Sequence, residues 1–201
     1  MTSEIDAGFC PCPAHGLVVM LFRLGLSTLE RTQAERLPTT KGVSKMDISI
    51  TQYYNLFDYT LRNILKTHNI NIDAHDYDEH EHFFCMRALC IFKLDKLLFD
   101  YKQKHDHLRM VLSGKSALVS YLANEKDMPF NDSKNISLND ALIVLWEDIK
   151  AVEIPNEVIY YLTTNCSVRL GDYEPRFYMA RYSEYLDPEW DPDVWDRRLL
   201  K

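Results

Sequence analysis

The stretch ISITQYYNLFDYTLRNILKTHNI (residues 48–70), NIDAHDYDEHEH (71–82) and FFCMRALCIFKLDKLLFDY (83–101) decides the fold of this chain. Its first and third parts carry apolar side chains at spacings of three and four residues, the pattern of an amphipathic helix. The stripe positions are Ile50, Tyr54, Phe57, Leu61, Ile64 and Leu65, then Phe83, Met86, Cys90, Leu94, Leu97, Leu98 and Tyr101. The sequence predicts two antiparallel helices joined by an acidic, histidine-rich connection, with the second helix buried on more than one side.

The ends of the first helix carry their own signals. Ser49 or Thr51 can serve as N-cap, because a hydroxyl oxygen accepts from a free N–H of the first turn. Asn69 and Asn71, near the far end of this segment, suit the end of the helix.

The amino-acid composition limits the possible fold classes. The chain has 201 residues, 46% of them hydrophobic, which is enough for one core, and only six glycines, too few for a fold with many tight turns. Five cysteines, an odd number, favour reduced thiols in a cytoplasmic protein. The prediction is an all-α, single-domain helical bundle located in the cytoplasm.

The first 45 residues differ from the rest. They begin with acidic residues, and their apolar run GLVVMLFRLGL (16–26) is interrupted by Arg23. That run is shorter than the roughly 20 residues needed to span a bilayer. We expect 1–45 to be a flexible, loosely attached N-terminal extension, 46–201 to be the helical domain, and no membrane partner.

Further helices are expected after residue 101. One covers about 106–124 with a bend at residues 113–114, and MPFNDSKNI (128–136) is expected to be a loop. Ser137 caps a helix that stops before Pro155. The segment 156–168 fits a strand or a short helix, and 174–186 fits a helix with a proline in its first turn.

The letters SGKS (113–116) invite a phosphate-loop interpretation. That loop needs a glycine five residues before Gly114, where this chain has Arg109, and it must follow a strand. The preceding segment is predicted to be helical. No nucleotide cofactor is therefore expected.

The segment RNILKTH places Arg62 six residues before His68. It resembles the arginine-to-histidine signature of HEPN domains, helical bundles found in prokaryotic defence and toxin ribonucleases. The resemblance implies a dimer that cleaves RNA without metal. Histidine can move the 2′-hydroxyl proton near neutral pH, and arginine can stabilise the charge on the phosphate. The alternative is a surface arginine and a helix-terminal histidine that interacts with the helix dipole.

The connection HDYDEHEH (75–82) offers imidazole and carboxylate groups, the ligands of zinc, iron or manganese. Only His75 with Glu79, or Asp78 with His82, share a helix face at a spacing of four. The alternative is a solvated acidic helix start. Because no complete ligand set is present, no metal is expected.

The C-terminal region from Tyr173 to Trp195 is aromatic and acidic. Tyrosine, tryptophan and arginine are the residue types that dominate protein interfaces. The candidate partner-binding residues are Tyr178, Arg181, Tyr182, Trp190 and Trp195. The alternative is an arm that folds back and covers the bundle with its two tryptophans.

The formal net charge of −7 argues against a broad nucleic-acid surface and suits a basic partner. We therefore expect a protein-binding function, in the manner of an inhibitor, an immunity or antitoxin protein, or a phage or defence accessory factor. A metal-independent ribonuclease using Arg62 and His68 is the second hypothesis. A nucleic-acid-binding regulator is the third.

Overall fold

The computed structural model describes residues 47–71, 75–166 and 183–200, and for residues 75–79 it describes the backbone alone. The chain divides into two units, Met1–Lys41 and Gly42–Lys201, and every described residue belongs to the second. The predicted N-terminal extension lies outside the described residues. Within the described part there are helices and no strand, which confirms the all-α class.

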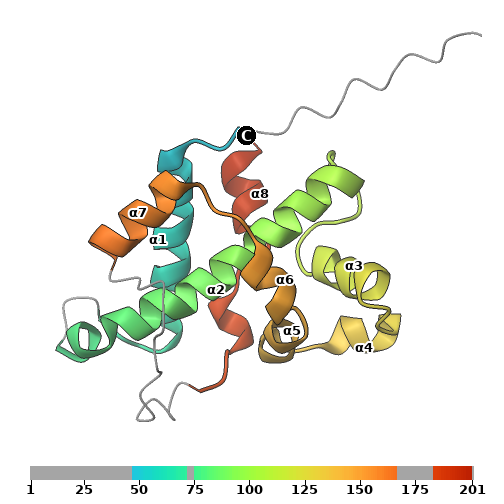
Figure 1. Ribbon diagram of the computed structural model, residues 1–201. Coiled ribbons are helices and arrows are strands. Elements are labelled where there is room, and N and C mark those ends of the chain that lie inside the picture. Colours follow the sequence, from blue (N-terminus) through green and yellow to red (C-terminus); the bar gives the residue numbers. More distant parts are fainter. Residues whose placement is uncertain (1–46, 72–74, 167–182, 201) are drawn as a thin grey trace, which may run out of the picture. The chain divides into compact units, whose positions relative to one another are not determined.

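The described elements are helices (Figure 1). They are α1 (Ile50–Thr67), α2 (His75–His105), α3 (Ser116–Glu125), α4 (Phe130–Asn135), α5 (Leu138–Val144), α6 (Trp146–Ala151), α7 (Asn156–Asn165), the 3₁₀ turn η2 (Asp187–Glu189) and α8 (Val194–Leu199). None of the described helices is long and apolar enough to cross a membrane.

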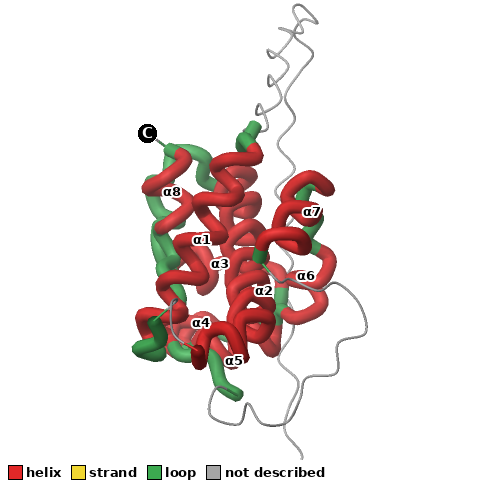
Figure 2. Tube along the Cα trace, turned by 90° about the vertical axis from the view of Figure 1, so that its left-hand side faces the viewer, coloured by secondary structure: helices red, strands yellow, loops and turns green. Residues whose placement is uncertain are grey.

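Helix α2 is the central element. It contacts α1, α3, α6 and α8, and α1 crosses it obliquely rather than lying antiparallel along it (Figure 1). Seen from the side, α8 lies on one side of α1 and α2, whereas α6 and α7 lie on the other (Figure 2). Buried side chains therefore surround α2 from Phe84 to Lys102, which confirms that it is buried on more than one side.

Local chemistry sets both ends of α1. The Ser49 hydroxyl accepts from the Gln52 amide at 3.3 Å, and the Gln52 side chain accepts from the Ser49 amide at 2.8 Å. This reciprocal capping box confirms Ser49 as the N-cap. The helix ends at Thr67, with His68 as its C-cap and Asn69 in the left-handed region at φ 56°.

Three predicted boundaries were wrong. Helix α2 begins at His75, so most of the expected connection is helical. The expected helix over 106–124 begins only at Ser116, because the Asp106 carboxylate binds the amides of residues 110–112 and Gly114 takes φ +53°. The expected loop over 128–136 contains α4.

The helix capped by Ser137 is also divided. Its start is confirmed, because the Ser137 hydroxyl accepts from the Asp140 amide at 3.1 Å. At Leu145 the backbone leaves helical geometry, with φ −95° and ψ 8°, which separates α5 from α6. The ambiguous segment after Pro155 forms the helix α7.

Candidate functional site

The two residues of the HEPN-like signature have different environments. The Arg62 side chain is 66% exposed, and its Nε donates to the Asp58 carboxylate at 2.8 Å. The His68 side chain is 9% exposed, and its Nε2 lies 2.9 Å from Glu189 Oε1. His68 is at the helix end, as expected, but its imidazole lies in the interior.

Glu189 is the centre of a buried ion cluster. Arg87 Nε lies 2.6 Å from one carboxylate oxygen and its Nη2 lies 2.7 Å from the other, so the pair is bidentate. Arg87 also donates to the carbonyl of Glu184 and stacks on the Tyr185 ring at 3.9 Å. Both charged side chains are almost fully buried. This cluster ties the segment 183–190 to α1 and α2.

Four further acids of the C-terminal segment accept hydrogen bonds from other parts of the fold. Asp187 accepts from the Leu138 amide (2.7 Å), Asp191 from the Tyr59 hydroxyl (2.8 Å), Asp193 from the Gly114 amide (2.6 Å) and Asp196 from Arg109 Nε (2.8 Å). Each partner lies on another part of the fold. The acidic character of this segment therefore fastens the chain to itself.

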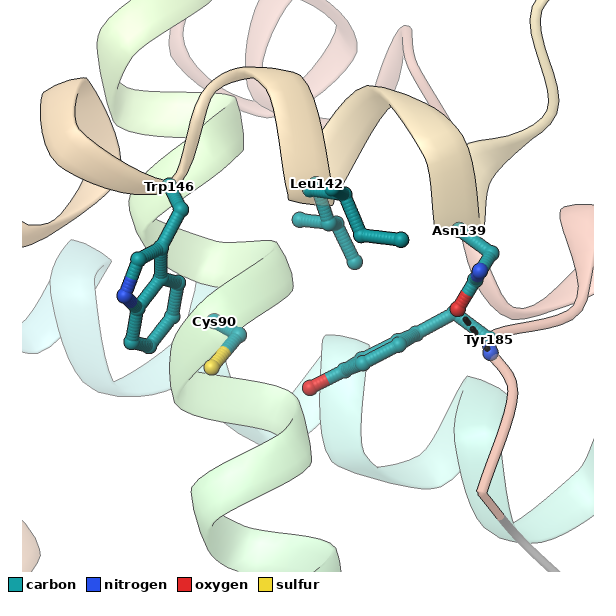
Figure 3. A pocket seen from close by; sticks show the side chains of 6 residues that line it. Cys90, Asn139, Leu142, Trp146 and Tyr185 are labelled. Carbon is teal, nitrogen blue, oxygen red and sulfur yellow. Dashed lines mark hydrogen bonds between the residues drawn. The ribbon is translucent and has the colours of Figure 1, made fainter.

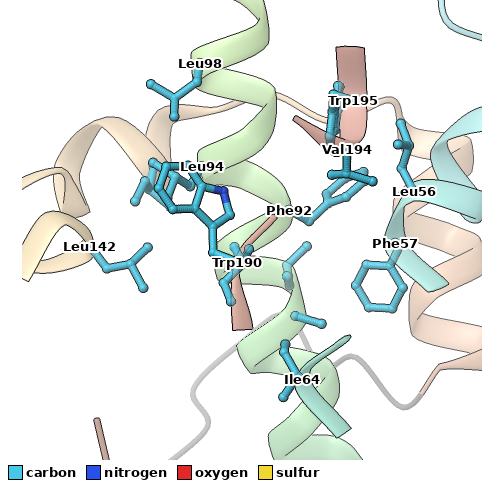
Figure 4. Close-up of a cluster of buried hydrophobic side chains, with 14 of the residues drawn as sticks. Leu56, Phe57, Ile64, Phe92, Leu94, Leu98, Leu142, Trp190, Val194 and Trp195 are labelled. Carbon is cyan, nitrogen blue, oxygen red and sulfur yellow. The ribbon is translucent and has the colours of Figure 1, made fainter. Parts of the chain in front are cut away.

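The two C-terminal tryptophans lie in the core (Figure 4). The Trp190 ring lies beside Leu94 and Leu98 of α2. Trp195 is 1% exposed, and its ring centroid lies 5.3 Å from that of Phe92 and 5.5 Å from that of Phe99. This is the arrangement of the covering arm, the alternative to an exposed interface. The other three candidate partner-binding residues, Tyr178, Arg181 and Tyr182, lie outside the described residues.

Most side chains of the candidate metal-binding connection, those of residues 75–79, lie outside what the structure describes. Among the described side chains of 47–71, 80–166 and 183–200, no group of three or more His, Cys, Asp or Glu residues is placed to hold a metal ion. Cys90 and Cys166 are free thiols.

An apolar pocket of about 310 Å³ opens between α2, α5, α6 and the segment 183–186 (Figure 3). Its walls are almost entirely apolar. The lining residues are Cys90, Asn139, Leu142, Ile143, Trp146 and Tyr185. The break at Leu145 matters here, because it separates the short helices that present Leu142 and Trp146 to the same hollow (Figure 3).

Two large apolar side chains on the pocket wall remain in contact with solvent. Ile143 is 68% exposed and Trp146 is 46% exposed. The neighbouring Val144 is also exposed. Exposed apolar side chains gathered around a hollow are typical of binding surfaces, whereas scattered single ones are not.

The polar groups of the pocket hold its shape. The Tyr185 amide donates to Asn139 Oδ1 at 3.2 Å, and the Tyr185 hydroxyl points toward the Cys90 thiol (Figure 3). Burial raises the pKa values of both the Cys90 thiol and the Tyr185 hydroxyl. Both groups therefore stay protonated near neutral pH, so Cys90 lacks the thiolate character that a nucleophile needs.

Exposed carboxylates flank the pocket along the chain. Asp140, Glu147 and Glu184 each adjoin a lining residue. On the α6 side, Lys150 lies 2.8 Å from Glu147, and Lys93 donates to the carbonyl of Lys150 at 3.3 Å.

The sequence reasoning did not identify this pocket. One signal was present: ALIVLW (141–146) is apolar at six consecutive positions, more than a single helix face can bury.

Comparisons with protein-family models, with curated proteins and with solved structures found no match to this chain.

Proposed function

We propose that this protein is a protein-binding module and that its docking site is the pocket lined by Leu142, Ile143, Trp146 and Tyr185. The partner would insert an apolar side chain and place lysine or arginine beside Asp140 and Glu184. The observation that carries the proposal is the exposed Ile143 and Trp146 at an apolar hollow.

The size and chemistry of the pocket support an anchor side chain as its occupant. Ligand pockets span about 300–1,000 Å³, and this one lies at the lower end of that range. Tryptophan in a pocket that a partner dehydrates is among the residues that contribute most to binding. The protonated Cys90 and the apolar walls favour binding over chemistry.

The ribonuclease hypothesis has less support. A groove that cleaves RNA needs the arginine and the histidine accessible together. The exposed Arg62 is paired with Asp58, whereas the buried His68 is engaged by Glu189. The narrower classes of inhibitor, immunity protein and antitoxin stay predictions.

Selection from a random peptide display library tests the proposal with a defined probe. The immobilised full-length chain should enrich peptides that carry an aromatic or branched aliphatic residue next to lysine or arginine. Trp146→Ala and Ile143→Glu should each weaken binding of the selected peptides at least about tenfold. Tyr160→Ala is the matched control, because Tyr160 is an exposed aromatic residue on α7, away from the pocket lining.

Enrichment that survives both pocket substitutions, or that favours acidic peptides, would contradict the proposal. Thermal melts of the variants check the fold. Ile143 is 68% exposed and Trp146 is 46% exposed, so we expect melting temperatures close to that of the wild type.

A further inference from the structure

One wall of the pocket is a tyrosine on an extended stretch of chain. Tyr185 lines the pocket, and its hydroxyl points toward the Cys90 thiol (Figure 3). The described residues 183–186 lie outside any helix. Leu186 has extended backbone geometry at φ −96° and ψ 138°, and the turn η2 begins only at Asp187. Because no helix carries Tyr185, side-chain contacts must fix the position of this wall.

Arg87 of α2 supplies the closest of these contacts. Its guanidinium group stacks on the Tyr185 ring, with Cζ 3.9 Å from the ring centroid. Arg87 and Cys90 are three residues apart on α2 and share a helix face, so the tyrosine side chain extends from one to the other. Arg87 is 3% exposed and does not belong to the pocket lining. It therefore acts on the pocket through the tyrosine ring.

The same guanidinium group fixes the backbone on both sides of Tyr185. It donates to the carbonyl of Glu184, one residue before, and holds the Glu189 carboxylate at 2.6 and 2.7 Å. Glu189 Oε1 in turn accepts from the Leu186 amide at 3.0 Å, one residue after. The Tyr185 amide donates to Asn139 Oδ1 at 3.2 Å. One buried side chain thus orients the ring and the chain on each side of it.

A lysine could not make the same set of contacts. A guanidinium group is a planar fork that pairs with both oxygens of a carboxylate and stacks on an aromatic face. The ammonium group of lysine is a compact charge without a planar surface. Arg87→Lys therefore keeps a positive charge beside Glu189 but removes the support of the Tyr185 ring.

We propose that Arg87 is the positioning residue of the docking pocket and that it acts by holding Tyr185 as the wall beside Cys90. This inference rests on the proposed function, because it names a residue that sets the affinity of the same site without touching the ligand. A wall that is fixed before binding loses little conformational entropy when a partner docks. A wall that has to be ordered on binding lowers the affinity.

The rate at which iodoacetamide alkylates Cys90 in the folded full-length chain reports the position of the wall. Burial raises the pKa of this thiol, so the wild type should react slowly. Arg87→Lys should speed the alkylation of Cys90 at least about tenfold, because the displaced ring exposes the thiol. Cys166, which is outside the pocket lining, should keep its rate. Peptide mass mapping distinguishes the two thiols.

A control variant separates positioning from a general loss of stability. Leu122→Ala removes a fully buried side chain of α3, outside the pocket lining, and lowers stability through the cavity that it leaves. It should leave the Cys90 rate near that of the wild type. Glu189→Gln weakens the hold on the guanidinium group and should raise the Cys90 rate by less than Arg87→Lys does. It serves as the test variant if Arg87→Lys does not fold.

Binding of the selected peptides gives a second measurement. Arg87→Lys should weaken binding at least about fivefold, and Tyr185→Ala should weaken it as well. Adding Arg87→Lys to Tyr185→Ala should cause no further loss, because the guanidinium group acts through the ring that is already absent. Circular dichroism confirms that each variant is folded.

An unchanged Cys90 rate in a folded Arg87→Lys variant would overturn the inference, as would an equal rise in Leu122→Ala. Losses of affinity from Arg87→Lys and Tyr185→Ala that simply add would also overturn it. If peptides bind in a Trp146-dependent manner and Arg87→Lys changes neither measurement, the inference fails and the proposed function stands. If the Cys90 rate responds as expected but no peptide binds, the proposed function fails and the positioning of the wall stands.

Discussion

The Trp190 indole Nε1 donates to Asp95 Oδ1 at 2.7 Å inside the bundle. Burial raises the pKa of Asp95 to about 8, and the hydrogen bond from Trp190 opposes that rise only in part. A carboxyl group in the middle of α2 thus holds the C-terminal segment and carries a proton near neutral pH. This contact makes the stability of the fold depend on pH.

Replacing Asp95 with asparagine should change that pH dependence. Since the folded-state pKa lies above the ordinary value of 3.8, the folded state holds a proton that the unfolded state has lost. The contribution of Asp95 is complete below about pH 4 and is lost as pH rises to about 8. The measurement is urea unfolding of both proteins at several pH values. As pH rises from about 4 to about 8, the free energy of unfolding of the wild type should fall relative to that of Asp95→Asn, by at most about 1.4 kcal/mol per pH unit.

The asparagine side chain keeps an oxygen that accepts the hydrogen bond from Trp190. The substitution therefore removes the titrating proton of the carboxyl group and keeps the hydrogen bond. Parallel stability profiles of the wild type and Asp95→Asn between pH 4 and 8 would rule out this assignment.

Breaking the buried Arg87–Glu189 pair should be strongly destabilising. Arg87→Met leaves the Glu189 carboxylate buried without its bidentate partner, and we expect a loss of about 3–5 kcal/mol in the free energy of unfolding. Arg62→Ala is the matched control, since its pair with Asp58 is exposed and contributes little to the free energy of unfolding. Similar losses in the two variants by chemical denaturation would contradict the described cluster.

Arg62→Ala also tests the ribonuclease hypothesis, because removing this exposed side chain leaves the buried cluster intact. His68→Ala is less suitable, because removing the buried imidazole disturbs Glu189 and should lower stability by about 1–3 kcal/mol. We expect purified wild type to leave RNA intact. RNA cleavage by the wild type that Arg62→Ala abolishes, with an unchanged melt, would revive that hypothesis.

Deleting residues 1–45 should leave the described bundle folded. Among residues 47–71, 75–166 and 183–200, the buried core runs from Tyr53 to Trp195. A chain starting at Met46 should therefore unfold cooperatively, with a melting temperature within about 3 °C of the full-length protein. A second truncation that removes 187–201 takes away Trp190 and Trp195 and should abolish cooperative unfolding. Loss of cooperativity in the Met46 form would show that the N-terminal residues stabilise the fold.

Local patterns predicted most of the helices. The stripe from Phe57 to Leu65 and the Ser49 cap are properties of a few neighbouring residues, so α1 could be identified with its ends. The start of α2 has no apolar period and was missed. The segment 106–115 was predicted to be helical because Leu108, Val111 and Leu112 lie at helical spacings. The hydrogen bonds of the Asp106 carboxylate, which hold the backbone in another conformation, cannot be read from such a pattern.

The candidate site could not be predicted because it is formed by contacts between residues that are far apart in the sequence. Tryptophans among acids fit both an exposed arm and a folded-back one, and only partners such as Arg87 for Glu189 decide between them. The pocket likewise needs Tyr185 to reach Cys90, a contact that no local pattern indicates.

The most direct test of the pocket uses the three tryptophans of the chain as probes. In a ¹⁵N–¹H spectrum each indole N–H gives one signal, and only Trp146 is exposed, whereas Trp190 and Trp195 are buried. A selected peptide added to the full-length protein should shift the Trp146 signal and leave the other two in place. If Trp190 or Trp195 shifts while Trp146 does not, the binding surface lies in the C-terminal segment and the proposed pocket is wrong.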